Sequence, residues 1–386
     1  MRLRAPFAMI LLASMQALAA QSAPTDSACD NFFGQRCRID LSSGVHMSYF
    51  EVGPAGGDPL ILLHTDTTGA VEWAWTVRAL RRLDPDLHIY ALDQRGSGAT
   101  DLPDTKECWL RPNLCMAIDA LSADLLAFMQ ARHIDRATLF GHAFGATVAR
   151  HFTLQHPQRV VRLILSGTGL PARTSATAAA RLAGMEPLGW RGLLEAKGVP
   201  WPQGALHMRP IDIDPDAVRT LTRSWDISAI AAPEVVTTIA AQTAAEWLDS
   251  WGTLDPTPMP PQPQDDLASL TAPTLVLWGS EDFYLNRASQ EALIERLRQA
   301  SRAHPGMYFY WKQYGVRPAP RSGNKHEADD IGHNLSWEAP EQLAADIESF
   351  VRHGTPTRDR YRSDAPTDIH RILVESGQAT IVSSRP

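Results

Sequence analysis

The sequence predicts an α/β fold in which a mostly parallel β-sheet is covered by helices on both faces. Short apolar runs bounded by turn residues recur along the chain, as expected of strands that are buried on both faces. Segments with helical spacing lie between several of these runs, and such alternation is typical of a parallel sheet. The chain has 386 residues, of which 44% are hydrophobic, so it can bury a large core.

The first predicted element is a β-hairpin over residues 36–52, which alternate apolar and polar residues on both sides of Ser42-Ser43-Gly44. Five buried strands are then predicted, namely Leu60–His64, His88–Asp93, Thr138–Gly141, Val161–Ser166 and Thr274–Gly279. Helical spacing predicts helices over 117–131 and 146–156, and an amphipathic pattern predicts another over 339–351.

Residues 1–20 have the pattern of a signal peptide. Arg2 and Arg4 precede a short apolar run at 8–13, and small residues at 17–20 form an A-x-A cleavage pattern. The apolar run is too short for a stable membrane span. We therefore expect an exported protein, periplasmic or extracellular, whose mature form has no membrane span.

Export favours disulfide bonds at the four cysteines, because disulfides persist in oxidising compartments. The sequence positions are Cys29, Cys37, Cys108 and Cys115. Four cysteines permit three pairings, and the sequence does not choose among them, although local pairing is the simplest. Neither close pair has the C-x₂₋₄-C spacing that is typical of structural zinc, so no metal site is expected.

One long segment interrupts the alternation of strands and helices. Residues 170–270 lack strand-like runs, contain Ala-rich helical patterns and five tryptophans, and end in the proline-rich stretch 255–264. An insertion between two strands predicts a helical cap over the carboxyl edge of the sheet, with an independent second domain as the alternative. The expected organisation is a signal peptide (1–20), a core (21–169 and 271–353), the cap (170–270) and a C-terminal extension of unknown role (354–386).

The segment Gly141–Gly145 (GHAFG) lies between a predicted strand and a predicted helix. This is the setting of a nucleophile elbow, in which G-x-S-x-G turns sharply from strand to helix. Its glycines allow the tight turn, and the helix N-terminus offers positive partial charge to an oxyanion. Asp282 follows the strand at 274–279, and His333 precedes the last helix, so the order is elbow, acid, histidine.

With these motifs the chain resembles the cap-bearing branch of the α/β-hydrolase superfamily over residues 36–352. The stretch Asp93–Gly98 (DQRGSG) is similar to secreted prolyl-aminopeptidase-like members, and also to epoxide hydrolases and esterases, so it selects no substrate. The resemblance implies that Asp282 orients His333 and that His333 is the general base.

The resemblance also implies an oxyanion hole formed by the backbone amides of Thr65 and Phe144. Two positions depart from the family pattern. Thr65 follows His64 where the family usually has glycine, and Ala143 occupies the nucleophile position. Alanine cannot attack a carbonyl, which closes the acyl-enzyme route, although binding and an oxyanion hole alone can leave ~10³–10⁴-fold over water.

Three explanations of Ala143 stay open. It can be a Ser→Ala substitution made to trap a substrate. It can be native to a nucleophile-free enzyme, in which His333 activates water or abstracts a substrate proton in a lyase-type reaction. It can also be native to a non-catalytic ligand-binding protein. The presence of both Asp282 and His333 in order favours the first two explanations.

The leading functional hypothesis is hydrolysis of an ester or amide bond in a small, partly apolar substrate held under the cap. The formal net charge of −7 argues against a nucleic-acid partner, because such binding needs a basic face. No cofactor motif is present; GPAGG at 53–57 is not followed by the helix or the Lys-Ser/Thr of a phosphate-binding loop. The sequence does not indicate the oligomeric state.

Overall fold

The structure is a computed structural model that describes residues 37–65, 69–100, 115–170, 265–279, 282, 285, 287–314 and 332–357. The expected signal peptide, nearly all of the expected cap, and the C-terminal extension beyond residue 357 lie outside these residues. What the sequence predicts for those segments therefore stays a prediction.

An eight-stranded sheet forms the centre of the described fold, in the order β1-β2-β4-β3-β5-β6-β7-β8. β2 pairs antiparallel with both β1 and β4, and every other neighbouring pair is parallel. The strands are β1 (Cys37–Asp40), β2 (His46–Val52), β3 (Pro59–Leu63), β4 (His88–Leu92), β5 (Ala137–His142), β6 (Val160–Ser166), β7 (Thr274–Gly279) and β8 (Phe309–Tyr314).

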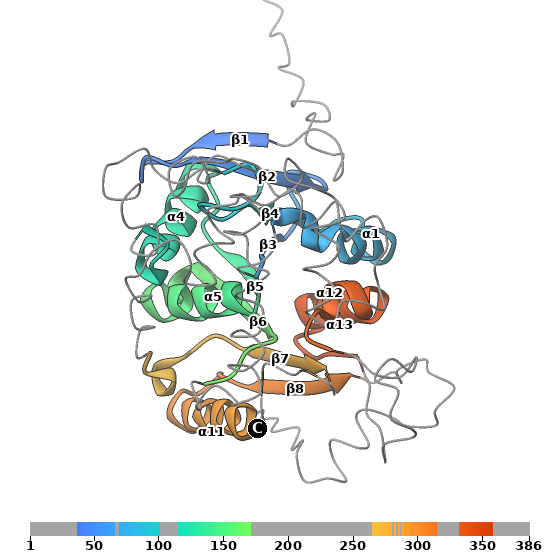
Figure 1. Ribbon diagram of the computed structural model, residues 1–386. Coiled ribbons are helices and arrows are strands. Elements are labelled where there is room, and N and C mark those ends of the chain that lie inside the picture. Colours follow the sequence, from blue (N-terminus) through green and yellow to red (C-terminus); the bar gives the residue numbers. More distant parts are fainter. Residues whose placement is uncertain are drawn as a thin grey trace, which may run out of the picture.

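Helices cover both faces of this sheet (Figure 1). One face carries α1 (Ala74–Leu83), α12 (Leu335–Glu338) and α13 (Pro340–His353), with α1 packed on α13. The other face carries α4 (Ile118–Ala131), α5 (Phe144–Gln155) and α11 (Arg287–Ala303). Three short 3₁₀ helices are η1 (Ala70–Trp73), η2 (Pro157–Arg159) and η7 (Leu267–Ser269). The arrangement confirms the predicted fold class.

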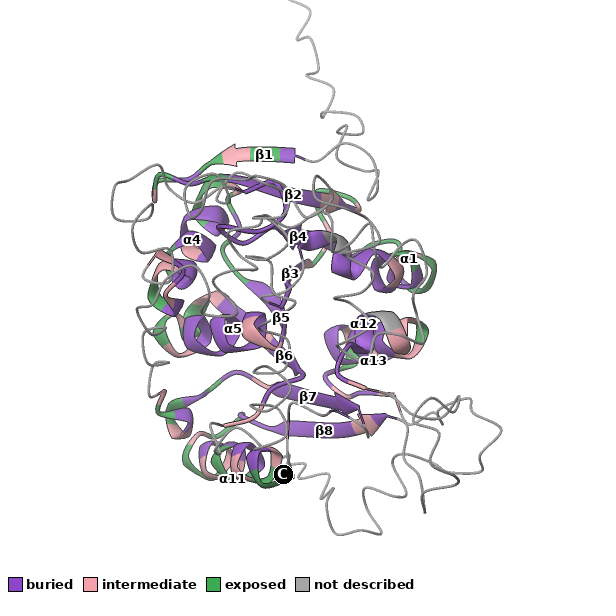
Figure 2. Ribbon diagram, in the orientation of Figure 1, coloured by how far each residue is buried: buried purple, intermediate pink, exposed green. Residues whose placement is uncertain are grey.

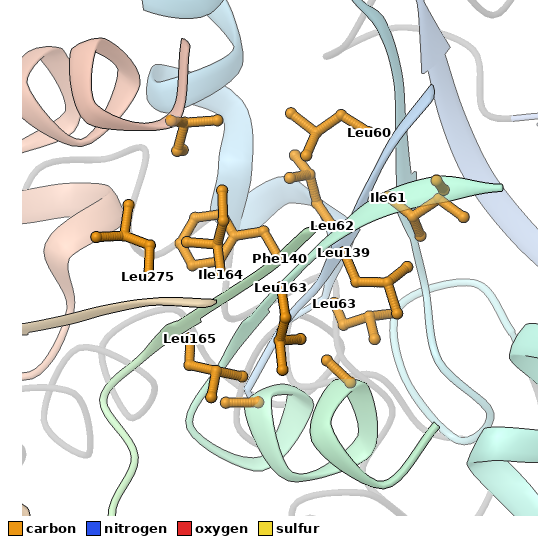
Figure 3. Packing of buried hydrophobic residues seen from close by; sticks show 14 of the residues in the cluster. Leu60, Ile61, Leu62, Leu63, Leu139, Phe140, Leu163, Ile164, Leu165 and Leu275 are labelled. Carbon is orange, nitrogen blue, oxygen red and sulfur yellow. The ribbon is translucent and has the colours of Figure 1, made fainter. Parts of the chain in front are cut away.

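The core lies between the sheet and its two helical layers, and the central strands are buried throughout (Figure 2). Side chains of β3, β5, β6 and β7 point to both faces of the sheet and pack against the helices (Figure 3). Leu60, Ile61, Leu62 and Leu63 are each at most 1% exposed. Burying a side chain of this size contributes about 1.5–3 kcal/mol to the free energy of folding. Because β3 is covered on both faces, this gain applies to successive residues, and its sequence is an uninterrupted apolar run.

The predicted hairpin and the five predicted strands are all present, as β1 to β7, within one or two residues of their expected bounds. The predicted helices are present as α4, α5 and α13. The sequence patterns above do not predict β8, α1 or α11. In β8 the pattern is interrupted by Lys312, a charged residue that is only 2% exposed. Its ammonium donates to both carboxylate oxygens of Asp346 at 2.7 and 2.9 Å.

Two of the four cysteines lie in the described part of the chain. Cys37 begins β1 and Cys115 lies just before α4, and each is disulfide-bonded. Cys29 and Cys108 lie outside the described residues, so the pairing stays a prediction. Among the helices that the structure describes, none is both long and apolar enough to cross a bilayer.

Candidate active site

The turn between β5 and α5 has the geometry of an elbow, and Ala143 occupies its tip. The backbone of Ala143 has φ 47° and ψ −107°, a region that non-glycine residues rarely adopt. Holding a side-chain-bearing residue there costs about 1–3 kcal/mol. The N–H of Ala143 donates to the carbonyl oxygen of Ser166 at 2.9 Å, which anchors the tip to the end of β6.

The two glycines of the elbow are required by close packing. A Cβ on Gly141 would lie 2.3 Å from the carbonyl oxygen of Gly145, where α5 starts. A Cβ on Gly145 would lie 2.3 Å from the carbonyl oxygen of Leu63, at the end of β3. Both contacts are with backbone, which cannot move aside cheaply. The glycine spacing seen in the sequence therefore reflects how closely β5, α5 and β3 approach one another.

The structure brings together the two titratable residues that the sequence placed in the site. Asp282, after β7, and His333, before α12, are both largely buried, and Nδ1 of His333 lies 2.9 Å from Oδ2 of Asp282. The other oxygen of Asp282 accepts the N–H of Leu285 at 3.2 Å. A carboxylate at Nδ1 favours the proton on that nitrogen, and in this tautomer Nε2 of His333 carries the lone pair that can accept a proton.

His333 also lies next to the elbow, because its ring contacts that of His142, the residue before Ala143. The two ring centroids are 4.9 Å apart. Gly167, at the end of β6, makes room for this contact. A Cβ at Gly167 would lie 2.8 Å from Cε1 of His333 and 2.9 Å from the ring of His142.

A glutamate holds the loop that carries His333. Glu338, at the end of α12, accepts the N–H of Gly332 at 2.6 Å and that of Asn334 at 3.0 Å, the residues on either side of His333. Burial raises the pKa of the Glu338 carboxyl above its ordinary value, and the two backbone hydrogen bonds offset this only in part. Sequence patterns do not reveal this role, because Glu338 sits in an ordinary helical segment.

A second pair of histidine and carboxylate forms at the elbow itself, between His142 and Glu72. Nδ1 of His142 is 2.6 Å from Oε1 of Glu72, and Nε2 of His142 donates to the backbone carbonyl of His333 at 3.0 Å. The side chains of His142 and Glu72 are 2% and 0% exposed. Sequence reasoning missed Glu72. Its one signal is an isolated acid within the apolar stretch Ala70–Ala74.

Thr65, expected to provide an oxyanion donor, is engaged elsewhere in this structure. Its N–H donates to Oε2 of Glu72 at 3.1 Å. The preceding His64 is also structural, since its Nε2 accepts the N–H of Gln94 at 3.0 Å. The other expected donor, Phe144, is the first residue of α5, where backbone N–H groups have no acceptor within the helix. Of the two expected donors, Phe144 therefore has the better placed N–H.

Hydrogen bonds and an ion pair hold the loop after β4 in place. The carboxylate of Asp93 accepts the N–H of Ala70 at 2.7 Å and that of Ala99 at 3.1 Å. Arg95 forms a buried two-point ion pair with Asp124, with both distances 2.6 Å. These contacts assign the DQRGSG stretch a structural role.

Within the described ranges no group of three His, Cys, Asp or Glu side chains is placed to hold a metal ion.

A sequence profile of the α/β hydrolase fold matches residues 58–307, which is more than half of the chain. The chain belongs to the α/β hydrolase family. This α/β hydrolase is 32% identical over 135 residues to epoxide hydrolase A of Mycobacterium tuberculosis, covering 35% of this chain and 39% of that protein. It is 29% identical over 135 residues to a proline iminopeptidase of Heyndrickxia coagulans, covering 35% of this chain and 43% of that protein.

The match spans only about two fifths of the length of these curated relatives. Solved structures of α/β hydrolases resemble the chain more broadly. A serine-to-alanine variant of the meta-cleavage product hydrolase of Pseudomonas fluorescens IP01, complexed with acetates, matches with a TM-score of 0.55 and 19% identity. That match covers 83% of this chain and 98% of the other. At this identity the likeness shows the shared fold.

Proposed function

We propose that this α/β hydrolase cleaves an ester or amide bond in a small, partly apolar substrate, with His333 as the general base. The observation that carries the proposal is the hydrogen bond between Nδ1 of His333 and Asp282, formed next to the elbow. A buried base oriented by a carboxylate is the part of a hydrolytic site that moves protons. Relatives named as an epoxide hydrolase and a proline iminopeptidase support a hydrolytic reaction.

Because Ala143 carries no nucleophile, water attacks the substrate carbonyl directly in this form of the protein. Nε2 of His333 takes a proton from the water as the new C–O bond forms, and the N–H of Phe144 stabilises the oxyanion. The imidazolium then returns the proton to the leaving alcohol or amine as the scissile bond breaks. General-base catalysis of this kind contributes about 10²–10⁴-fold, less than a complete nucleophilic site supplies.

The test compares the protein as it is with Ala143→Ser, on a panel of nitrophenyl esters and aminoacyl anilides. Turnover by the alanine form that is lost in His333→Ala supports direct attack by water. Turnover only in Ala143→Ser means that the hydrolase needs a serine nucleophile. This sequence is then a Ser→Ala variant made to trap a substrate, or an enzyme that has lost its nucleophile. Reading the native gene at codon 143 then separates a substitution from a natural loss.

Ligand binding without chemistry is the second candidate function. Two observations favour it. The residue at the elbow tip is Ala143, and the N–H of Thr65 donates to the carboxylate of Glu72 and not to a substrate oxyanion. A binding protein of this type would retain ligands under the cap without converting them. Binding of panel substrates, measured by calorimetry, without turnover in either the alanine or the serine form would support this candidate and reject hydrolysis.

We also infer that the protein is exported and that it acts outside the cytoplasm on a small-molecule substrate. The residue pattern at 1–20 supports export, and the disulfide bonds at Cys37 and Cys115 suit an oxidising compartment. Expression of the full chain, followed by fractionation and N-terminal sequencing, tests this inference. We expect a mature chain that begins near residue 21 and has no titratable thiol after denaturation. A cytoplasmic, uncleaved chain with free thiols would contradict it.

A further inference from the structure

Three segments that build the candidate site converge on one buried carboxylate. Glu72, in η1, accepts the N–H of Thr65 after β3 at 3.1 Å and approaches Nδ1 of His142 at 2.6 Å. The hydroxyl of Ser336, in α12, lies 3.4 Å from the same oxygen that His142 contacts. Thus a single side chain joins the β3 loop, the elbow and the segment that follows His333.

The hydrogen bonds of His142 fix where its protons lie. The carbonyl oxygen of His333 can only accept, so Nε2 of His142 must carry a hydrogen. The other nitrogen lies 2.6 Å from a carboxylate oxygen, and two lone pairs cannot face each other at that distance. One proton therefore lies between His142 and Glu72. The pair thereby holds the His142 ring with its Nε2–H directed at the backbone of His333.

The backbone of His333 is consequently held from both sides. Nε2 of His142 binds its carbonyl oxygen, and Glu338 binds the two amides that flank it. Gly167 leaves space for the rings of His142 and His333 to meet, with no room for a methyl group between them. Because the two rings pack this closely, a displacement of the His142 ring must also displace the His333 ring.

We propose that Glu72 is a positioning residue for this site and that it acts on His333 through His142. A fully buried carboxylate is costly unless several donors satisfy it, and the donors of Glu72 come from the segments that surround the elbow. Glu72 also engages the N–H of Thr65, which ties the β3 loop to the same anchor. The catalytic consequence rests on the proposed function, whereas the positioning itself does not.

The test uses the hydrogen-bonded Nδ1–H proton of His333, observed by NMR in protein labelled with ¹⁵N-histidine. His333→Gln assigns this signal by removing it. In Glu72→Ala, the His142 ring loses its partner, and we expect the His333 signal to shift or to broaden through exchange with water. In Glu72→Gln, the amide can donate to Nδ1 of His142 and accept from Thr65, so we expect the signal to be largely retained.

Asp346→Asn is the matched control, because Asp346 is an equally buried carboxylate that pairs with Lys312 away from the elbow. We expect Asp346→Asn to lower stability without moving the His333 signal. An unchanged His333 signal in folded Glu72→Ala overturns the proposal. If Glu72→Ala does not fold, Glu72→Asp replaces it as the test, because the shorter side chain of aspartate cannot reach both His142 and Thr65. Displacement of the His333 signal in Glu72→Asp then supports the proposal, and an unchanged signal overturns it.

A kinetic readout separates this inference from the proposed function. In whichever of the alanine and serine forms turns over substrate, Glu72→Ala is expected to lower kcat by up to ~10²-fold with a smaller change in KM, as for a misplaced base. If neither form turns over any substrate, the proposed function fails, and the NMR signal still decides the role of Glu72.

Discussion

The N–H of Ala143 donates to the carbonyl oxygen of Ser166 at 2.9 Å, so the end of β6 holds the elbow tip in its unfavourable backbone conformation. The geometry that exposes a nucleophile is thus present in a chain whose tip residue has none. Backbone strain of this kind is retained only where the surrounding structure enforces it. The elbow therefore owes its shape to the packing of β5, β6 and α5, and not to the side chain at its tip.

We expect Ala143→Gly to stabilise the protein. Glycine adopts φ 47° without the strain of about 1–3 kcal/mol, and the gain exceeds the backbone entropy cost of about 0.5–1 kcal/mol. The free energy of unfolding, measured with urea, should rise by about 1 kcal/mol. The control is Ala146→Gly, three residues later inside α5, which should lower it by a similar amount. A decrease in both variants would show that the tip carries no strain.

Gly145→Ala should be strongly destabilising. The added methyl group would lie 2.3 Å from the carbonyl oxygen of Leu63, so α5 must move away from β3 at a cost of about 1–3 kcal/mol or more. Urea denaturation of Gly145→Ala and of Gly56→Ala forms the comparison, because a Cβ on Gly56 meets nothing within 4 Å. We expect Gly56→Ala to be neutral or slightly stabilising. Equal effects in the two variants would contradict the close packing of the elbow.

The raised pKa of Glu338 predicts a pH dependence of stability. Because burial raises this pKa in the folded protein, the folded state binds the proton more tightly than the unfolded chain does. The resulting stabilisation is complete below the ordinary pKa of a glutamate and is lost as the pH rises through the raised value. The urea midpoint of the native protein minus that of Glu338→Gln should therefore decrease as the pH rises through this acidic range.

Glu341→Gln is the control for Glu338, since the Glu341 side chain is 73% exposed on the neighbouring helix α13. It should follow the native pH dependence. A Glu338→Gln curve that is parallel to the native one would mean that Glu338 is not the group responsible.

Asp282→Asn should lower kcat by about 10²–10⁴-fold in whichever form turns over substrate, while leaving the fold intact. The amide of asparagine favours the other tautomer of His333, whose Nε2 then carries a hydrogen and cannot accept a proton. Steady-state kinetics together with a thermal melt make the measurement. Asp124→Asn, which disturbs the buried ion pair with Arg95, serves as the control. It should lower the melting temperature and have little effect on kcat. Full activity in Asp282→Asn would refute the role of this carboxylate.

Much of the fold follows from local patterns. The runs that form β3 to β7 are mostly apolar, and most of their residues are buried, as expected of strands that helices cover on both faces. The apolar pattern does not predict β8, because Lys312 interrupts its apolar run. Burial of this charge depends on Asp346, which is 34 residues away in the sequence. A local pattern cannot reveal a partner that arrives from another helix.

The same division applies to the candidate site. The sequence by itself determined the elbow with its two glycines, the absence of a nucleophile at Ala143, and the order in which Asp282 and His333 follow, because these are properties of residue type and chain order. Only the tertiary structure decided that Glu72 and His142, 70 residues apart, form a buried pair, and that His142 reaches His333 across 191 residues. A carboxylate can be buried only where donors from distant segments converge, and that convergence exists only once the sheet has brought the segments together.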